Sequence, residues 1–85
     1  VTVSRSGGSG ETVQHPGQEF VHCLTGRVEY LVAGDSFFLD PGDSLLFDAT
    51  QPHSFRNAGN EEAKVVLVLQ ASEGTGIGRA RHMNV

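Results

Sequence analysis

The chain has 85 residues, 38% of them apolar, and a formal net charge of −4 at neutral pH, which allows one small domain with a single core. Six Lys and Arg residues against ten Asp and Glu argue against a domain that contacts nucleic acid by itself, because binding a phosphate backbone needs clustered cations. The single cysteine, Cys23, excludes an internal disulfide and fits a cytoplasmic protein. The longest apolar run, Val65–Leu69, is too short to cross a membrane.

Short strands separated by turns follow one another along the chain, and no segment predicts a helix. Thr25-Gly26 is expected to close a hairpin, and Pro41-Gly42 within Asp40–Asp43 is typical of a tight turn. The strands are expected at Thr2–Arg5, Glu19–Leu24, Arg27–Val32, Phe37–Leu39, Ser44–Phe47, His53–Arg56 and Lys64–Gln70. Their spacing of roughly 8–12 residues, without alternating helices, predicts an all-β sandwich or barrel.

The same pattern divides the chain into three parts. Residues 1–10 are expected to form an N-terminal strand and a Gly/Ser loop, residues 11–71 the barrel, and residues 72–85 a Gly-rich flexible tail. The strand Lys64–Gln70 is apolar on both faces, so one face fills the barrel and the other predicts a homodimer. Because the chain begins at Val1 without a methionine, we expect it to be part of a longer protein.

Two histidines and one glutamate predict a metal site. His15 and Glu19 are four residues apart, so in an extended segment both point to the same face. His53 follows Pro52 and can join them from a partner strand. Two imidazoles and a carboxylate are a common set for one divalent ion with open coordination positions.

Both segments fit longer motifs, and the chain resembles the cupin superfamily in them. That family has a first motif G-x5-H-x-H-x3-E-x6-G and a second motif G-x5-P-x-G-x2-H-x3-N. Without a gap, these fall on Gly7, Val13, His15, Glu19 and Gly26, then on Gly42, Asp48, Thr50, His53 and Asn57. The departures are Val13 for the first histidine, Asp48 for proline and Thr50 for glycine. The resemblance implies a small double-stranded β-helix, or jelly-roll barrel, that is commonly dimeric.

The resemblance also implies that His15, Glu19 and His53 are the metal ligands, whereas Val13 cannot coordinate an ion. The remaining set is that of non-haem Fe(II) oxygenases, but Fe, Mn, Ni and Zn all suit these ligands. A metal-free site that binds a ligand through hydrogen bonds stays open as the alternative.

The segments around His15–Val21 and Pro41–Asp48 are similar to the C-terminal cupin domain of helix-turn-helix transcription regulators. This predicts a module that senses a small molecule for a DNA-binding part outside this chain. They also resemble the cupin domain of hydroxypropylphosphonate epoxidase. The alternatives are therefore a metal-dependent oxygenase, epoxidase or isomerase, or a stand-alone small binding cupin.

Four residues are predicted to contact the small molecule: Phe47, Phe55, Gln51 and Tyr30. With Phe37 and Phe38, the first two are also expected in the core or cavity wall. Cys23 shares its parity with Glu19 and is expected to line the barrel floor, whereas His22 points away from the cavity. The sequence assigns no catalytic residue and no organic cofactor.

Overall fold

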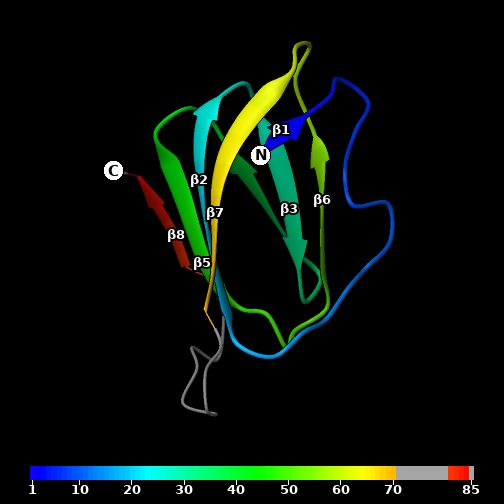
Figure 1. Ribbon diagram of the computed structural model, residues 1–85, viewed down its shortest axis with the longest axis vertical. Coiled ribbons are helices and arrows are strands. Elements are labelled where there is room, and N and C mark those ends of the chain that lie inside the picture. Colours follow the sequence, from blue (N-terminus) through cyan, green and yellow to red (C-terminus); the bar gives the residue numbers. More distant parts are fainter. Residues whose placement is uncertain (71–80, 85) are drawn as a thin grey trace.

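The computed structural model describes residues 1–70 and 81–84, and Figure 1 shows their arrangement. Their strands are β1 (Thr2–Val3), β2 (Gln18–Thr25), β3 (Val28–Val32), β4 (Asp35–Leu39), β5 (Asp43–Asp48), β6 (His53–Asn57), β7 (Ala63–Gln70) and β8 (Arg81–Asn84). The described residues contain no helix, so none that could cross a membrane. The seven strands expected from the sequence all form, and β8 is added to them.

Two antiparallel sheets form the molecule. One has five strands in the order β1-β7-β2-β5-β8, and the other has three in the order β4-β3-β6. Figure 1 shows the two sheets facing each other, with the connection between β1 and β2 passing around the outside of β6. This arrangement confirms the predicted all-β jelly roll.

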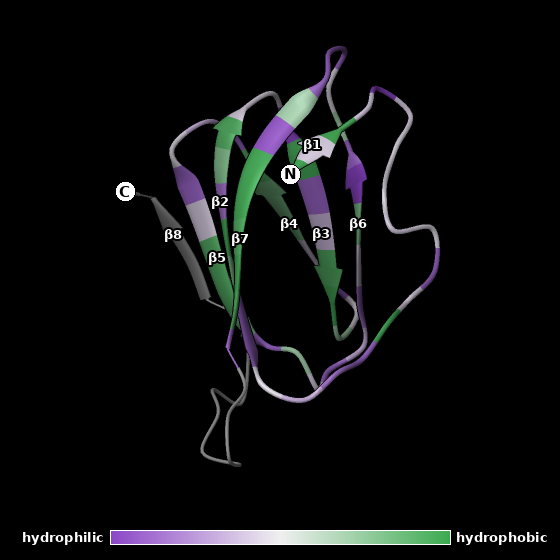
Figure 2. Cartoon of the chain, viewed as in Figure 1, coloured by the Kyte–Doolittle hydropathy of each residue, from purple (hydrophilic) through white to green (hydrophobic). Residues whose placement is uncertain are grey.

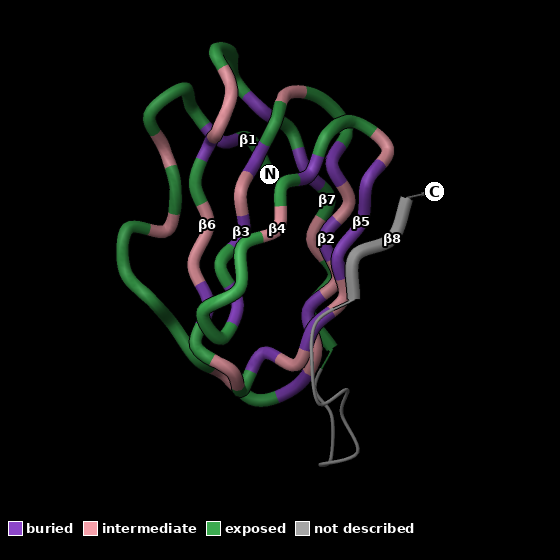
Figure 3. Tube along the Cα trace, turned by 180° about the vertical axis from the view of Figure 1, so that it is seen from behind, coloured by how far each residue is buried: buried purple, intermediate pink, exposed green. Residues whose placement is uncertain are grey.

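The core fills the space between the sheets. Along β2 and β3 buried residues alternate with less buried ones, as period-two side-chain direction requires, and Figure 3 shows this alternation. Figure 2 shows the hydrophobic residues concentrated on the strands, β5 and β7 among them. The largest buried side chains are Tyr30, Phe47, Leu39, Leu45, Val21, Val28 and Val32.

The prediction that Thr25-Gly26 closes a hairpin is wrong. The chain does turn there, with Gly26 at a φ of 79°, but β2 pairs with β5 and β7, whereas β3 pairs with β4 and β6. The turn therefore carries the chain from one sheet to the other. A Cβ on Gly26 would lie 2.8 Å from Ala63, so glycine allows this close crossing.

The turn expected at Pro41-Gly42 forms, and a further turn joins β3 to β4. Ala33 and Gly34 both have positive φ, 50° and 89°, and close the hairpin of β3 and β4. At the turn between β4 and β5, the Asp43 N–H donates to the Asp40 carbonyl over 2.9 Å, and the Asp43 carboxylate accepts from the Asp40 N–H. These aspartates bond their own turn, as expected.

The connection between β1 and β2 is fastened to β6. Gly8 pairs with Arg56, and a Cβ there would lie 2.4 Å from the Phe55 carbonyl oxygen. Further along, Val13 pairs with His53 through two backbone hydrogen bonds of 2.8 and 3.0 Å. A stretch without a long strand of its own thus reaches the first residue of β6 in a fixed position.

The C-terminal stretch differs from the flexible tail expected over residues 72–85. Arg81–Asn84 forms β8, which pairs antiparallel with β5 from Asp43 to Leu46. The sequence did not predict this strand, because four residues are too few to show a clear alternation and the stretch before them is polar and rich in glycine. Residues 72–80 and 85 lie outside the described residues.

Candidate metal centre

Three separate segments deliver the predicted ligands to one place. Glu19 is the second residue of β2 and shares the inward face with the buried Val21. His53 is the first residue of β6, where its backbone pairs with both Val13 and Val32. His15 lies in the connection before β2, held by a 2.9 Å hydrogen bond from its N–H to the Ala49 carbonyl.

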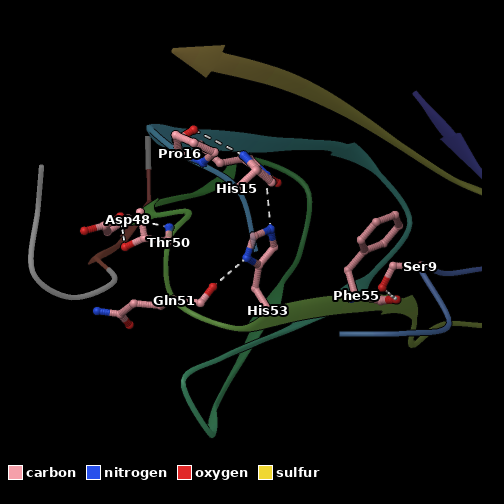
Figure 4. A network of polar contacts seen from close by, with 9 residues as sticks. Ser9, His15, Pro16, Asp48, Thr50, Gln51, His53 and Phe55 are labelled. Carbon is pink, nitrogen blue, oxygen red and sulfur yellow. Dashed lines mark hydrogen bonds and ion pairs between the residues drawn. The ribbon is translucent and has the colours of Figure 1, made fainter. Parts of the chain in front are cut away.

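The side chains of these three residues converge. The Nε2 atoms of His15 and His53 lie 3.4 and 3.5 Å from the same oxygen, Glu19 Oε1. One ligand atom from each residue lies within 4.8 Å of the other two. The two imidazole rings meet edge to face with centroids 5.1 Å apart, and Figure 4 shows them turned toward each other. The expected convergence is therefore confirmed.

A backbone carbonyl sets the tautomer of His53. Its Nδ1 lies 2.8 Å from the Gln51 carbonyl oxygen, which only accepts hydrogen bonds, so Nδ1 carries the proton. His15 Nδ1 faces the Pro16 carbonyl in the same way at 3.4 Å. A histidine that donates from Nδ1 to a carbonyl leaves Nε2 for a metal ion, the arrangement typical of metal-binding histidines.

The donor set fits a first-row divalent ion. Ligand atoms about 2.1 Å from a common ion lie about 3.0–3.4 Å apart in octahedral or tetrahedral geometry, close to the observed 3.4 and 3.5 Å. The side chains of His53 and Glu19 are 3% and 7% exposed, but that of His15 is 36% exposed. A bound ion would therefore be reached from the His15 side.

Val13 leaves the position of a fourth ligand apolar. In an antiparallel pair, opposed residues project side chains from the same face of the sheet. Because Val13 opposes His53, its side chain lies beside that imidazole, and it is 44% exposed. The sequence departure at Val13 thus becomes a hydrophobic surface at the rim of the site.

The four residues predicted to contact a ligand differ in their burial and in what they contact. Phe47 is fully buried with its ring 4.8 Å from the His53 ring, and Phe55 stacks on Tyr30 at 5.3 Å. Gln51 supports His53 through its backbone carbonyl. Their contacts with a small molecule remain predictions, although Phe47, Tyr30 and Phe55 do form one aromatic wall of the interior.

Tyr30 has an unusual hydroxyl group. The residue is 1% exposed, yet its Oη makes no hydrogen bond to any residue that the structure describes. Burial, and then the negative charge of Glu19, raise the pKa of the phenol well above its usual range. Tyr30 therefore offers a protonated donor inside the barrel without an acceptor from the described chain.

Leu69 is a site residue that the sequence argument missed. It opposes Glu19 in the β2–β7 ladder and is 63% exposed, so its side chain lies on the same sheet face at the open end. The signal was present, because Leu69 shares its parity with Val65. Only the register, however, shows that Leu69 rather than Leu67 stands next to Glu19.

Other expectations have mixed outcomes. The prediction that Phe38 lies in the core is wrong, because the residue is 40% exposed. The Arg27 guanidinium carbon lies 4.6 Å from the centroid of its ring. Cys23 is fully buried in the core, as expected, and burial followed by the charges of Asp40 and Asp43 raises the pKa of its thiol. His22 bonds the Ser44 hydroxyl at 2.6 Å and takes no part in the metal site.

Comparisons with known proteins agree with this geometry. The family model described as "Cupin domain" matches residues 1–69. The curated protein "Polyketide synthase CurC" of Streptomyces cyaneus is 39% identical over 56 residues, which are 65% of this chain and 36% of that protein.

Two solved structures from Escherichia coli share the fold. YhaK is 13% identical with a TM-score of 0.82, covering 100% of this chain and 40% of its own. The pirin YhhW, solved with nickel(II), is 20% identical with a TM-score of 0.71, covering 96% of this chain and 42% of its own. The chain thus spans well under half the length of these relatives.

Proposed function

The chain belongs to the cupin domain family, and we propose that it binds one divalent metal ion through His15, Glu19 and His53 to hold a small molecule. The proposal rests on one observation: two imidazole Nε2 atoms lie within 3.5 Å of the same buried Glu19 oxygen. The Gln51 carbonyl presents the His53 lone pair to the same point. Three protein ligands leave positions open on the ion for other oxygen donors.

The residues of the chain have defined tasks in this proposal. Glu19 supplies the negative charge that offsets the ion, and its burial strengthens that attraction. The aromatic wall of Phe47 and Tyr30 limits water around the bound molecule. When bound, the ion supplies Lewis acidity and, for a redox metal, electron transfer.

We favour a metal-dependent enzyme over a stand-alone binding protein, because the 39% identical relative is named a polyketide synthase. Oxygenation, epoxidation and isomerisation are the reaction types that suit an open two-His, one-carboxylate site. The second candidate is the small-molecule sensor of a transcription regulator. It is supported by the sequence similarity around His15–Val21, and the described residues hold no second cluster of His, Cys, Asp and Glu that could bind a metal ion.

We also propose that the protein is a cytoplasmic homodimer that associates through the outer face of the five-stranded sheet. Apolar residues gather there in the β2–β5 and β2–β7 ladders: Phe20, Leu46, Val66 and Val68. Such a patch loses contact with water when a second copy covers it. Sedimentation or light scattering of the wild type and of Val68→Asp measures the association, and a monomeric wild type contradicts it.

Metal analysis tests the main proposal. The purified chain is loaded separately with Fe(II), Mn(II), Ni(II), Co(II) and Zn(II), and bound metal is counted after desalting. We expect one ion per chain in the wild type, loss in Glu19→Gln, and retention in Glu11→Gln, whose glutamate is an exposed residue of the connecting loop. A wild type that binds none of these ions contradicts the proposal.

Turnover separates the two candidate functions. An enzyme consumes dioxygen or isomerises a carbonyl compound repeatedly when loaded with metal, and Glu19→Gln abolishes this. A sensor binds its molecule stoichiometrically without converting it. Ligand recovered unchanged after prolonged incubation of the loaded protein therefore favours the sensor.

A further inference from the structure

We infer that the molecule held at this centre joins an oxygen-bearing head, which accepts a hydrogen bond from Tyr30, to an apolar body that lies over Val13 and Leu69. The inference rests on the proposed function and adds the chemical class of the ligand. Two kinds of observation carry it: an unpartnered donor inside the barrel and exposed apolar side chains at its mouth.

The donor is the Tyr30 hydroxyl. A buried hydroxyl without a partner costs free energy, so such groups normally meet an acceptor from the protein, from water or from a ligand. Tyr30 stacks on Phe55 and faces Phe47, whose own ring contacts His53. The phenol therefore belongs to the same interior wall as the metal ligands. Its missing acceptor is supplied by an oxygen atom that the described chain does not contain.

The apolar surface comes from two chain segments, each paired with a strand that carries a candidate metal ligand. Val13 stands beside His53 across a backbone pair, and Leu69 stands beside Glu19 across another. They are 44% and 63% exposed, although each is the immediate neighbour of a nearly buried metal ligand. A ligand that leaves the open positions of the ion passes these two side chains on its way to solvent.

Together these features favour one ligand class. A carbonyl, enol or hydroxamate head can bind the ion and accept from Tyr30, while an aromatic or acyl body covers the apolar rim. A small molecule that is polar throughout, such as oxalate, would satisfy the head of the site but leave Val13 and Leu69 in water. The apolar rim thus favours ligands with an apolar body over ligands that are polar throughout. The metal ligands alone do not distinguish these two classes.

Two hydroxamic acids test the rim. Acetohydroxamic and benzohydroxamic acid share one metal-binding head and differ in the apolar body, and their binding to the Co(II)-loaded chain is followed by the cobalt absorption bands. We expect benzohydroxamate to bind about tenfold more tightly, from the apolar area it removes from water. Val13→Ser should lower this preference about threefold, whereas Leu31→Ser should not. Leu31 is a matched control, since it is 41% exposed on the outer face of β3 and lies outside the proposed dimer surface.

The preference is a ratio within each variant, so a variant that is partly unfolded still reports it. Equal affinity for the two acids, or the same loss of preference in Leu31→Ser as in Val13→Ser, would contradict the inference that the ligand has an apolar body.

Tyr30→Phe tests the head. It should weaken both acids about fivefold through the lost hydrogen bond, with cobalt affinity unchanged because the phenol is not a metal ligand. Unchanged affinity for both acids would overturn the role of Tyr30. Failure of the wild type to bind Co(II) or any of the other four ions would instead overturn the proposed function, so the two failures are distinguishable.

Discussion

The two ends of the barrel differ in the partners of their buried polar groups. We call the end that holds Asn57 the closed end and the end that holds His15, Glu19 and His53 the open end. At the closed end, the Asn57 amide donates to the carbonyls of Val3, Ser4 and Glu61 and accepts from the Gly59 N–H. At the open end, Glu19 meets two imidazoles at 3.4 and 3.5 Å, and Tyr30 Oη meets no described acceptor. Both ends bury polar groups, but among the described residues Tyr30 Oη is the one buried side-chain polar atom without a partner, and it lies toward the end that holds the metal centre.

The difference separates polar groups that stabilise the fold from polar groups that are left for a ligand. Burying polar groups is tolerated when hydrogen bonds replace those to water. Asn57 ties the residues at the end of β1 to the turn between β6 and β7. Tyr30 keeps an unused donor, and the Glu19 oxygen between two imidazoles is placed to bind an ion. The following changes test this contrast, from the largest expected effect to the smallest.

Asn57→Ala removes the amide that joins three backbone carbonyls. We expect the free energy of unfolding to fall by about 3 kcal/mol, because one buried and two partly buried carbonyls lose the same donor. Urea denaturation measures the change. Asn60→Ala is the control, since Asn60 is an exposed residue of the same turn region, and equal effects of the two would contradict the role of Asn57.

Glu19→Gln keeps the shape of the side chain but removes its charge. We expect metal affinity to fall at least about 100-fold, equivalent to about 2.7 kcal/mol, while the unfolding free energy of the metal-free protein changes little. Calorimetric titration with Zn(II) measures the affinity. An affinity within a factor of three of the wild type would show that Glu19 is not a ligand.

Val13→His places an imidazole opposite His53. If the apolar position next to the triad is a missing fourth ligand, affinity for Ni(II) should rise about tenfold, because a nitrogen donor is added to the set. Val66→His, on the outer face of β7, should leave affinity as in the wild type. A gain in both variants would indicate nonspecific binding by added histidine.

Tyr30→Phe removes the unpartnered hydroxyl and keeps the ring stacked on Phe55. The metal-free protein should be unchanged or more stable by about 1 kcal/mol, because no hydrogen bond to the chain is lost. Thermal unfolding measures this. A loss of more than about 1 kcal/mol would show that the hydroxyl is already satisfied in the ligand-free protein.

Cys23 at the closed end predicts a small pH dependence. Burial raises the pKa of its thiol above the ordinary 9.0, so the unfolded chain loses this proton at lower pH than the folded one. The stabilisation is complete below pH 9 and is lost as pH rises toward the folded pKa, by a few tenths of a kcal/mol by pH 9.5. Denaturation at pH 7.5 and 9.5 measures it, and Cys23→Ala should show a weaker slope.

Much of the site was predictable from residue types and spacing. The four-residue separation of His15 and Glu19 placed them together, and His53 joined them as expected. Leu69 and the unpartnered Tyr30 hydroxyl were not predictable at this level, since both depend on which strand lies opposite which. The failed hairpin at Gly26 has the same origin. A turn signal reports local backbone conformation, whereas pairing between strands depends on the whole sheet.

The sequence by itself determined the all-β class, the positions of seven strands and the three candidate metal ligands. These follow from local turn chemistry, alternation of side chains and ligand spacing. The tertiary structure alone decided that β2 and β3 lie in different sheets, that β8 extends the larger sheet, and that Val13 and Leu69 border the metal centre. The physical reason is that these features arise from contacts between residues far apart in the chain, where register decides which side chains meet.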